Sequence, residues 1–127
     1  MSKWKQHQME DEVRRALANV NLSPEKAGHK FGRPYITAYQ LAIILSENNP
    51  DLCSKLEKQL GGKGTDEHHS LSQYVANELS VRIKNEEILD IEGVFLKTQD
   101  IVTLEFTHDV VSSATDTISL FRLKDEA

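Results

Sequence analysis

Cysteine is nearly absent from this sequence, since Cys53 is the only one among 127 residues. A single thiol cannot close an internal disulfide, and this favours a protein of a reducing compartment. Long apolar runs are also lacking: the longest, residues 41–45, is far shorter than the roughly 18 to 20 residues needed to cross a bilayer. Polar residues surround Trp4, where a signal peptide would carry an apolar block. We therefore expect a cytoplasmic protein without membrane contact.

Glycine and proline are sparse as well, with 6 and 3 copies in the chain. Collagen-like and low-complexity proteins need far more of both. Hydrophobic residues at 39% and charged residues at 28% are instead typical of a globular protein. At this length a single domain over residues 1–127 is expected, large enough to bury a sizeable core.

Positive charge is scarce in the second half of the chain. Residues 66–127 carry 5 Lys and Arg against 13 Asp and Glu, whereas residues 1–65 carry 10 against 7. The net charge of −5 thus conceals a mildly basic first half and a strongly acidic second half. This balance excludes a broad basic surface that coats nucleic acid, but it leaves room for a local anion site in the first half.

Apolar residues recur at helical spacing in four segments. A first amphipathic helix is expected over residues 2–20, and its mixed-charge surface makes residues 1–20 a candidate interaction arm toward another chain. Residues 21–35 read as an irregular connection, after which Thr37 and Gln40 have the spacing of a capping box and predict a helix start. The third helix is expected over residues 50–60, with Asn49 as N-cap. The fourth is expected to start between residues 66 and 70 and to end near residue 84, with Ser70 and Gln73 as a second capping box.

Alternating, β-rich runs follow residue 85. Residues 88–96 and 101–106 predict an antiparallel hairpin, and residues 117–123 predict a short last strand. The fold class is therefore α+β: four helices followed by a small, mostly antiparallel sheet built from the hairpin 88–106 and a C-terminal strand. The residues expected to be buried together are Leu41, Leu45, Leu56, Leu71, Val75, Leu79, Ile91 or Val94, and Leu104.

The order of these elements resembles that of a winged helix. The helix 66–84 takes the position of the recognition helix, and residues 88–106 take the position of the wing. The resemblance lies in element order alone, and it implies binding in a DNA groove. Acidic Asp66 and Glu67 at the start of the helix argue against such binding, because recognition helices contact bases through their N-terminal residues.

A glycine-rich loop, residues 61–65, precedes the fourth predicted helix. Glycines let backbone N–H groups approach an anion, the helix start directs positive charge at the same point, and Lys63 adds a full charge. The loop lacks the spacing of a Walker loop, so the alternative is a helix C-cap and connector. The phosphate-binding residues predicted here are Gly62, Lys63, Gly64, Thr65, His68 and His69.

A second unusual stretch, residues 29–35, combines three positive or titratable side chains with two aromatic rings and no acid. Arg33 suits bidentate binding of phosphate, Lys30 supplies a point charge, and Phe31 or Tyr35 can stack on a base. The alternative is that the rings anchor the connection while Arg33 caps or pairs locally. We expect Lys30, Arg33 and Lys63 to form one anion site with about three phosphate contacts.

No spacing of His, Cys or carboxylates matches a metal site, a catalytic triad or a nucleophile elbow. We therefore predict a non-catalytic binding protein, without cofactor, that holds a phosphate-bearing ligand such as DNA, RNA or a nucleotide. The catalytic alternative is phosphodiester chemistry, with His68 or His69 beside Lys63 as general acid or base. The alternative is an adaptor subunit of a homo- or hetero-oligomer, in which the basic N-terminal helix docks on the acidic half of a neighbour. In either case we expect a homo-oligomer.

Overall fold

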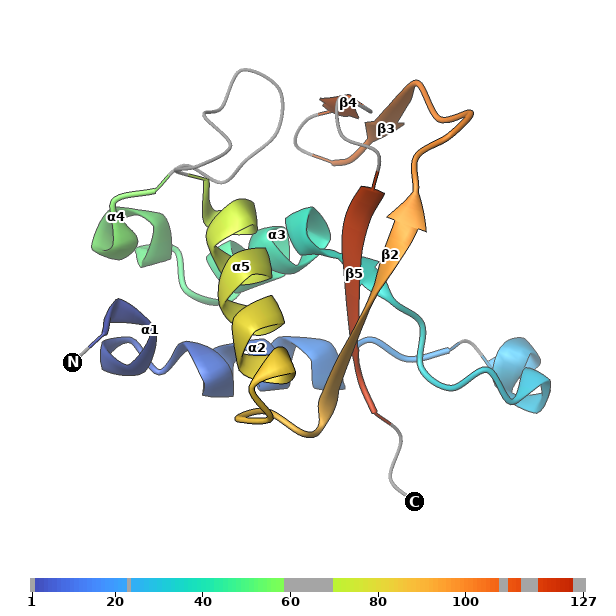
Figure 1. Ribbon diagram of the computed structural model, residues 1–127, viewed down its shortest axis with the longest axis horizontal. Helices are drawn as coiled ribbons and strands as arrows, with labels where there is room; N and C mark the ends of the chain where they lie inside the picture. The colour runs from blue at the N-terminus through green and yellow to red at the C-terminus, as the bar shows by residue number, and fades with distance from the viewer. Residues whose placement is uncertain (1, 23, 59–69, 108–109, 113–116, 125–127) are drawn as a thin grey trace.

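The protein, seen in a computed structural model, is described over residues 2–22, 24–58, 70–107, 110–112 and 117–124 (Figure 1). Helix α3 packs against α2 and α5, and all three contact the main sheet. The α+β class is therefore confirmed. The helices are α1 (Lys3–Gln6), α2 (Met9–Ala18), a 3₁₀ helix (Pro24–His29), α3 (Ala38–Asn48), α4 (Leu52–Leu56) and α5 (Leu71–Lys84). The strands are β1 (Ile36–Thr37), β2 (Ile91–Lys97), β3 (Thr103–Glu105), β4 (Val110–Ser112) and β5 (Thr117–Leu123).

The N-terminal segment forms two helices, so the predicted continuous helix over residues 2–20 is wrong. Between α1 and α2, Gln8 takes the left-handed conformation with a φ of 54°. The apolar spacing explains this break, because Trp4 and Met9 lie five positions apart and would point about 140° apart on one straight helix. The turn at Gln8 lets both side chains reach the core, where they are 1% and 0% exposed.

Helix α3 begins where the sequence predicted. The Thr37 hydroxyl accepts the backbone N–H of Gln40 at 3.0 Å, and the Gln40 side chain accepts the backbone N–H of Thr37 at 2.7 Å. The predicted capping box is therefore confirmed. The residues Ile36 and Thr37 also form β1, which pairs with β5. The sequence did not reveal β1, because two residues carry no alternation pattern.

The next two helices differ in how well they match expectation. Asn49 is the C-cap of α3, and α4 begins one turn later with Asp51 as N-cap, so the predicted start of the third helix is wrong. The end predicted for it, at residue 60, lies outside the described residues. The start of α5 is confirmed, since the Ser70 hydroxyl accepts the backbone N–H of Gln73 at 3.1 Å.

The main sheet has the strand order β1-β5-β2, with antiparallel pairing throughout. β2 pairs with β5 along seven residues, whereas β3 pairs with β4 in a separate two-stranded sheet. The predicted hairpin between residues 88–96 and 101–106 is therefore wrong. The longer C-terminal strand offers β2 more pairs than three-residue β3, and Phe121 opposite Gly93 fits closely, because a Cβ on that glycine would lie 3.0 Å from the ring.

Helices α2, α3 and α5 precede β2 and β5 in the chain, and β2 and β5 pair in antiparallel fashion. The wing expected over residues 88–106 does not form as a hairpin, because β2 pairs with β5 and residues 103–105 pair with β4. Figure 1 shows β2 and β5 side by side next to the helices, with β3 and β4 above the upper ends of these two strands.

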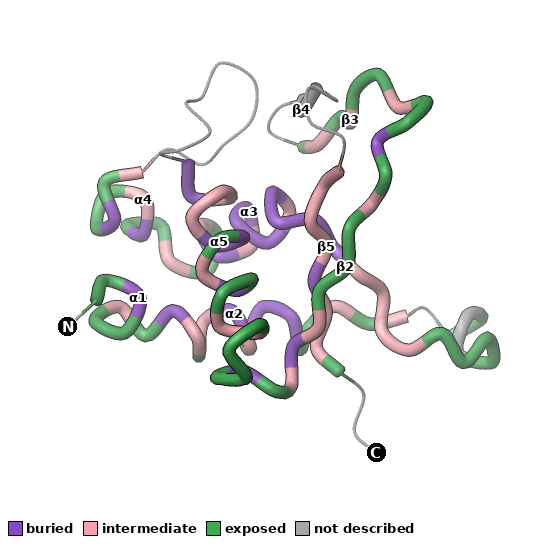
Figure 2. Tube along the Cα trace, viewed as in Figure 1, coloured by how far each residue is buried: buried purple, intermediate pink, exposed green. Residues whose placement is uncertain are grey.

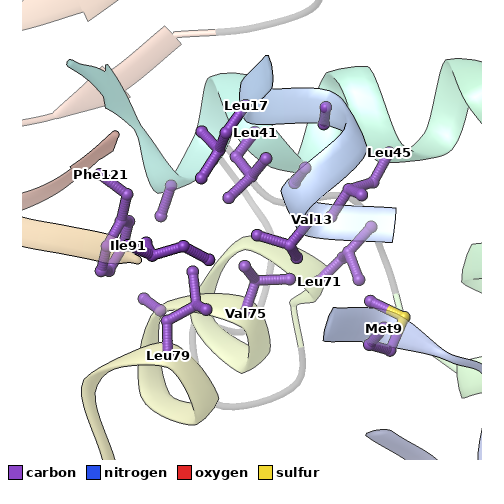
Figure 3. Close-up of a cluster of buried hydrophobic side chains, with 14 of the residues drawn as sticks. Met9, Val13, Leu17, Leu41, Leu45, Leu71, Val75, Leu79, Ile91 and Phe121 are labelled. Carbon is purple, nitrogen blue, oxygen red and sulfur yellow. The ribbon is translucent and has the colours of Figure 1, made fainter. Parts of the chain in front are cut away.

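Buried side chains from α2, α3, α5, β2 and β5 meet in one core (Figures 2 and 3). Most of the predicted core is confirmed, but Leu104 on β3 is only partly buried and lies outside this cluster. Val13 and Leu17 of α2 are fully buried as well, so the apolar face of the N-terminal segment is used for packing within the chain. An interaction role for its polar face stays a prediction.

Candidate functional site

Arg122 on β5 is the centre of a polar cluster that joins parts of the chain far apart in sequence. Its Nε donates to Oε1 of Glu92 on the neighbouring strand β2. Its Nη1 donates to two backbone carbonyls, that of Phe31 at 2.7 Å and that of Arg33 at 2.9 Å. One guanidinium therefore ties the segment of residues 29–35 to the main sheet, although the two lie about 90 residues apart in sequence.

Tyr35 completes this cluster from the other end of the segment. Its ring centroid lies 4.3 Å from Cζ of Arg122, within the range of a cation–π contact. Burial raises the pKa of Tyr35, and the negative charge of Glu92 raises it further. The phenol therefore stays neutral across the physiological range, and the Arg122 guanidinium occupies one face of its ring. Tyr35 is a packing partner of Arg122 in this geometry, which leaves Phe31 as the exposed ring of the segment.

Arg33 is engaged at the end of α2. Its Nη1 donates to the backbone carbonyl of Ala18 at 3.1 Å and to Oδ1 of Asn21 at 3.2 Å. Carbonyls at a helix C-terminus lack intrahelical partners, so they are available as acceptors. A cation there also interacts favourably with the negative end of the helix dipole. The arginine thus holds the start of the irregular connection against its end. This contact corresponds to the local capping role that the sequence left open for Arg33.

His29, Lys30 and Phe31 form an exposed tip on this anchored segment. Phe31 is 77% exposed, and its ring centroid lies 5.7 Å from that of His29. Lys30 and Gly32, on either side of Phe31, both have positive φ values of 61° and 84°. Such a conformation suits glycine and costs a lysine about 1 kcal/mol or more. The backbone is therefore bent sharply on both sides of Phe31, and the ring is held away from the core.

The tip lies at the edge of the molecule. In Figure 1 the segment that precedes β1 projects away from helices α1 and α4, and Figure 2 shows residues 28–31 as a continuous exposed stretch. Lys30 is exposed and makes no ion pair within the described part of the chain. An aromatic ring, an imidazole and an ammonium group thus face solvent together. This combination suits a ligand that has both a flat ring and a negative charge.

Three of the nine predicted site residues, Lys30, Arg33 and Tyr35, lie together in this segment. The other six, Gly62, Lys63, Gly64, Thr65, His68 and His69, lie outside the described residues. One anion site shared by Lys30, Arg33 and Lys63 therefore stays a prediction.

Two residues that organise the segment, Arg122 and Glu92, were missed by sequence reasoning. Arg122 stands in an apolar strand between Phe121 and Leu123, and an arginine there is a weak signal of a buried pair. Its partner Glu92 can be identified only once β2 and β5 are known to pair. No local pattern in the sequence carries that information.

Helix α5 presents little unpaired positive charge, although the sequence placed it where a DNA-recognition helix would lie. Arg82 pairs with Glu78 at 3.2 Å and with Glu87 at 2.9 Å, and its Cζ lies 5.2 Å from the ring centroid of Trp4. Its charge is therefore balanced by two neighbouring acids. Lys84 then remains as the other basic residue in the last turn of this helix.

Metal and membrane sites find no support in the described ranges. No group of three His, Cys, Asp or Glu side chains there is arranged to hold a metal ion. Within the same residues, every helix is too short or too polar to span a bilayer.

Burial raises the pKa of the Cys53 thiol, which disfavours the reactive thiolate.

Comparison of the chain with protein-family models, with curated proteins and with solved structures finds no match.

Proposed function

We propose that this protein is a non-catalytic binding protein that holds single-stranded nucleic acid on the tip formed by His29, Lys30 and Phe31. The observation that carries this proposal is the exposure of the Phe31 ring, at 77%, on a segment fixed by Arg122. An exposed aromatic ring in water is unfavourable, and fixing it there is consistent with a ligand that covers it.

A single strand fits this tip better than a duplex. Bases in a duplex are stacked on one another, whereas unpaired bases can stack on a protein ring and contribute roughly 1 to 3 kcal/mol each. The adjacent Lys30 ammonium can pair with a phosphate of the same strand, because a phosphate links each nucleotide to the next. The residues predicted in the loop 61–65 are proposed as further phosphate contacts, whereas Arg33 holds the segment in place through Ala18 and Asn21.

The fixed backbone favours binding, because it lowers the entropic cost of ordering the tip around a ligand. The carbonyls on both sides of Gly32 are already held by Arg122, so the loop does not have to become ordered when a ligand binds. Ordering a free loop costs roughly 0.5 to 1.5 kcal/mol for each immobilised side chain. A tip with only one ring and a few cations can therefore still reach measurable affinity.

Fluorescence anisotropy with a labelled mixed-sequence oligonucleotide tests the proposal. Phe31→Ala should weaken binding roughly 5- to 100-fold through loss of stacking. Lys30→Ala should weaken it less and reduce the slope of log K against log salt by about 0.7. Leu89→Ala is the matched control, because Leu89 is also exposed at 69% but lies on the connection between α5 and β2.

Competition by ligand type separates the remaining candidates. A mononucleotide that competes as well as the oligonucleotide would make the ligand a free nucleotide. Binding to a duplex that exceeds binding to the single strand would contradict the stacking model and favour groove contact by α5. Equal affinity in the wild type and in the Phe31→Ala/Lys30→Ala double variant would refute the proposal, and the adaptor hypothesis would then be the better account.

A further inference from the structure

The main sheet has one face that lies away from the helical core. Residues opposite each other in an antiparallel pair lie on the same face, and the face alternates along each strand. Ile91 and Phe121 belong to the core, so the odd-numbered residues of β2 and β5 lie on the helix side. The even-numbered residues form an outer face, and none of them belongs to the core cluster of the described chain.

Four apolar side chains gather on this outer face. Val94 pairs with Leu120, and Leu96 pairs with Ile118, so the four side chains form two adjacent pairs, which we call the outer patch. Val94 is 42% exposed, and the other three are partly exposed. Clustered apolar side chains on an accessible face are typical of a binding surface.

The tip formed by His29, Lys30 and Phe31 adjoins one end of the outer patch. Arg122 and Glu92 form the next pair along the same face, and Arg122 binds the backbone carbonyl of Phe31 at 2.7 Å. From this pair to the far pair of the outer patch the distance along the strands is about 13 Å, at roughly 3.3 Å per residue. In Figure 1 the segment that contains the tip extends to the right of β2 and β5, whereas α4 and α5 lie to their left. The tip and the outer patch are therefore parts of one surface.

Charge and shape limit what this surface can bind. The only charged residues among the even-numbered positions of β2 and β5 are Glu92 and Arg122, which neutralise each other in an ion pair. The outer patch thus attracts no phosphate, but it can bury the apolar parts of bases, above all the methyl group of thymine. A second sheet would pack about 10 Å from the first and would collide with the segment that Arg122 holds on this face. A single strand can pass beside that segment.

We propose that a single strand bound at the tip continues over the outer patch, with the bases of the next nucleotides against its apolar side chains and the phosphates toward solvent. This inference rests on the proposed function, since the tip has to hold the first base. It adds a longer footprint along β2 and β5 and a preference for thymine, whose methyl group the aliphatic side chains bury. The ligand is then single-stranded DNA.

Ligand length separates the outer patch from the tip. NMR titration measures weak binding and can compare a thymidine dinucleotide, which reaches the tip alone, with a thymidine hexanucleotide, which reaches both. Val94→Asp should weaken binding of the hexanucleotide about fivefold or more, because it places a carboxylate in the path of the strand, and should spare the dinucleotide. Val81→Asp is the matched control, since Val81 is 54% exposed but lies on α5. A loss shared by the two variants reports the added negative charge alone, and circular dichroism establishes that both are folded.

Base identity provides the second measurement. The thymidine hexanucleotide should bind at least about threefold more tightly than a deoxyuridine hexanucleotide, because each buried methyl group contributes to affinity. Dinucleotide binding that depends on Phe31, together with equal effects of Val94→Asp and Val81→Asp on the hexanucleotide, would overturn this inference and leave the proposed function standing. Equal affinity for the two hexanucleotides would also overturn it. Absence of binding by both thymidine ligands would refute the proposed function itself, and this inference with it.

Discussion

Replacing Arg122 with alanine removes four interactions, three of which join the segment 29–35 to the sheet. The charged donor loses the Glu92 carboxylate and two backbone carbonyls, and Tyr35 loses the cation over its ring. A hydrogen bond from a charged group contributes roughly 1.5 to 3 kcal/mol, and a partly exposed cation–π contact adds roughly 0.5 to 1 kcal/mol. These contributions are not additive.

Solvent reduces the expected loss, because the Arg122 side chain is 20% exposed and that of Glu92 is 32% exposed. Removal of one partner from a fully buried ion pair costs roughly 3 to 5 kcal/mol. For this partly solvated cluster we expect Arg122→Ala to lower the free energy of unfolding by about 3 kcal/mol. In a domain of this size the midpoint of thermal unfolding would fall by about 10 °C.

Urea unfolding monitored by circular dichroism measures this loss. Arg122→Lys should fall between wild type and alanine, since an ammonium retains the charge but cannot reproduce the planar fork. Arg15→Ala is the matched control: Arg15 also pairs with an acid, at 3.0 Å from Glu12, but on an exposed helix surface, so its loss should stay below about 0.5 kcal/mol. Equal losses for Arg122→Ala and Arg15→Ala would refute the role assigned to the cluster.

Three further predictions concern other parts of the fold. Thr37→Ala should lower the free energy of unfolding by about 1 kcal/mol in urea, because it removes the N-cap acceptor of α3. The hydrogen bond from Arg14 lowers the pKa of Asp90, so their contact stabilises the fold above pH ~4 and is lost as pH falls through the lowered pKa. Asp90→Asn should therefore cost about 1 kcal/mol at neutral pH, and urea unfolding below the lowered pKa should show almost no difference from wild type. Gly93→Val should cost roughly 1 to 3 kcal/mol in the same assay, because its Cβ would press on the buried Phe121 ring; an unchanged stability would show that the ring can move aside.

Local features of this fold were predictable from sequence because their causes are local. The capping residues Thr37 and Ser70 lie three positions from the N–H groups that they accept, so spacing alone identifies both helix starts. The same holds for the apolar rows of α3 and α5, which form the core that was expected. The 29–35 segment was likewise recognisable by composition, since its aromatic and basic residues are contiguous.

Long-range pairing was not predictable from one sequence. Several β-rich runs compete as partners for β2, and their alternation patterns are alike, so the sequence favours the nearest run over β5. The error also concealed the site, because the Arg122–Glu92 contact exists only when β2 pairs with β5. The break at Gln8 was missed for a related reason: it depends on where the core lies relative to Trp4, which is a property of the whole fold.

A tryptophan placed at the tip tests the central claim most directly. Phe31→Trp puts an indole at the exposed position, and the single natural tryptophan, Trp4, is 1% exposed and supplies a constant background emission. We predict that titration with a mixed-sequence single-stranded oligonucleotide at low salt quenches the emission of the introduced indole, because a base stacks on it, and that added salt reverses the quenching. Emission that stays unchanged in the folded variant up to saturating oligonucleotide would contradict the assignment of this tip as a nucleic-acid site.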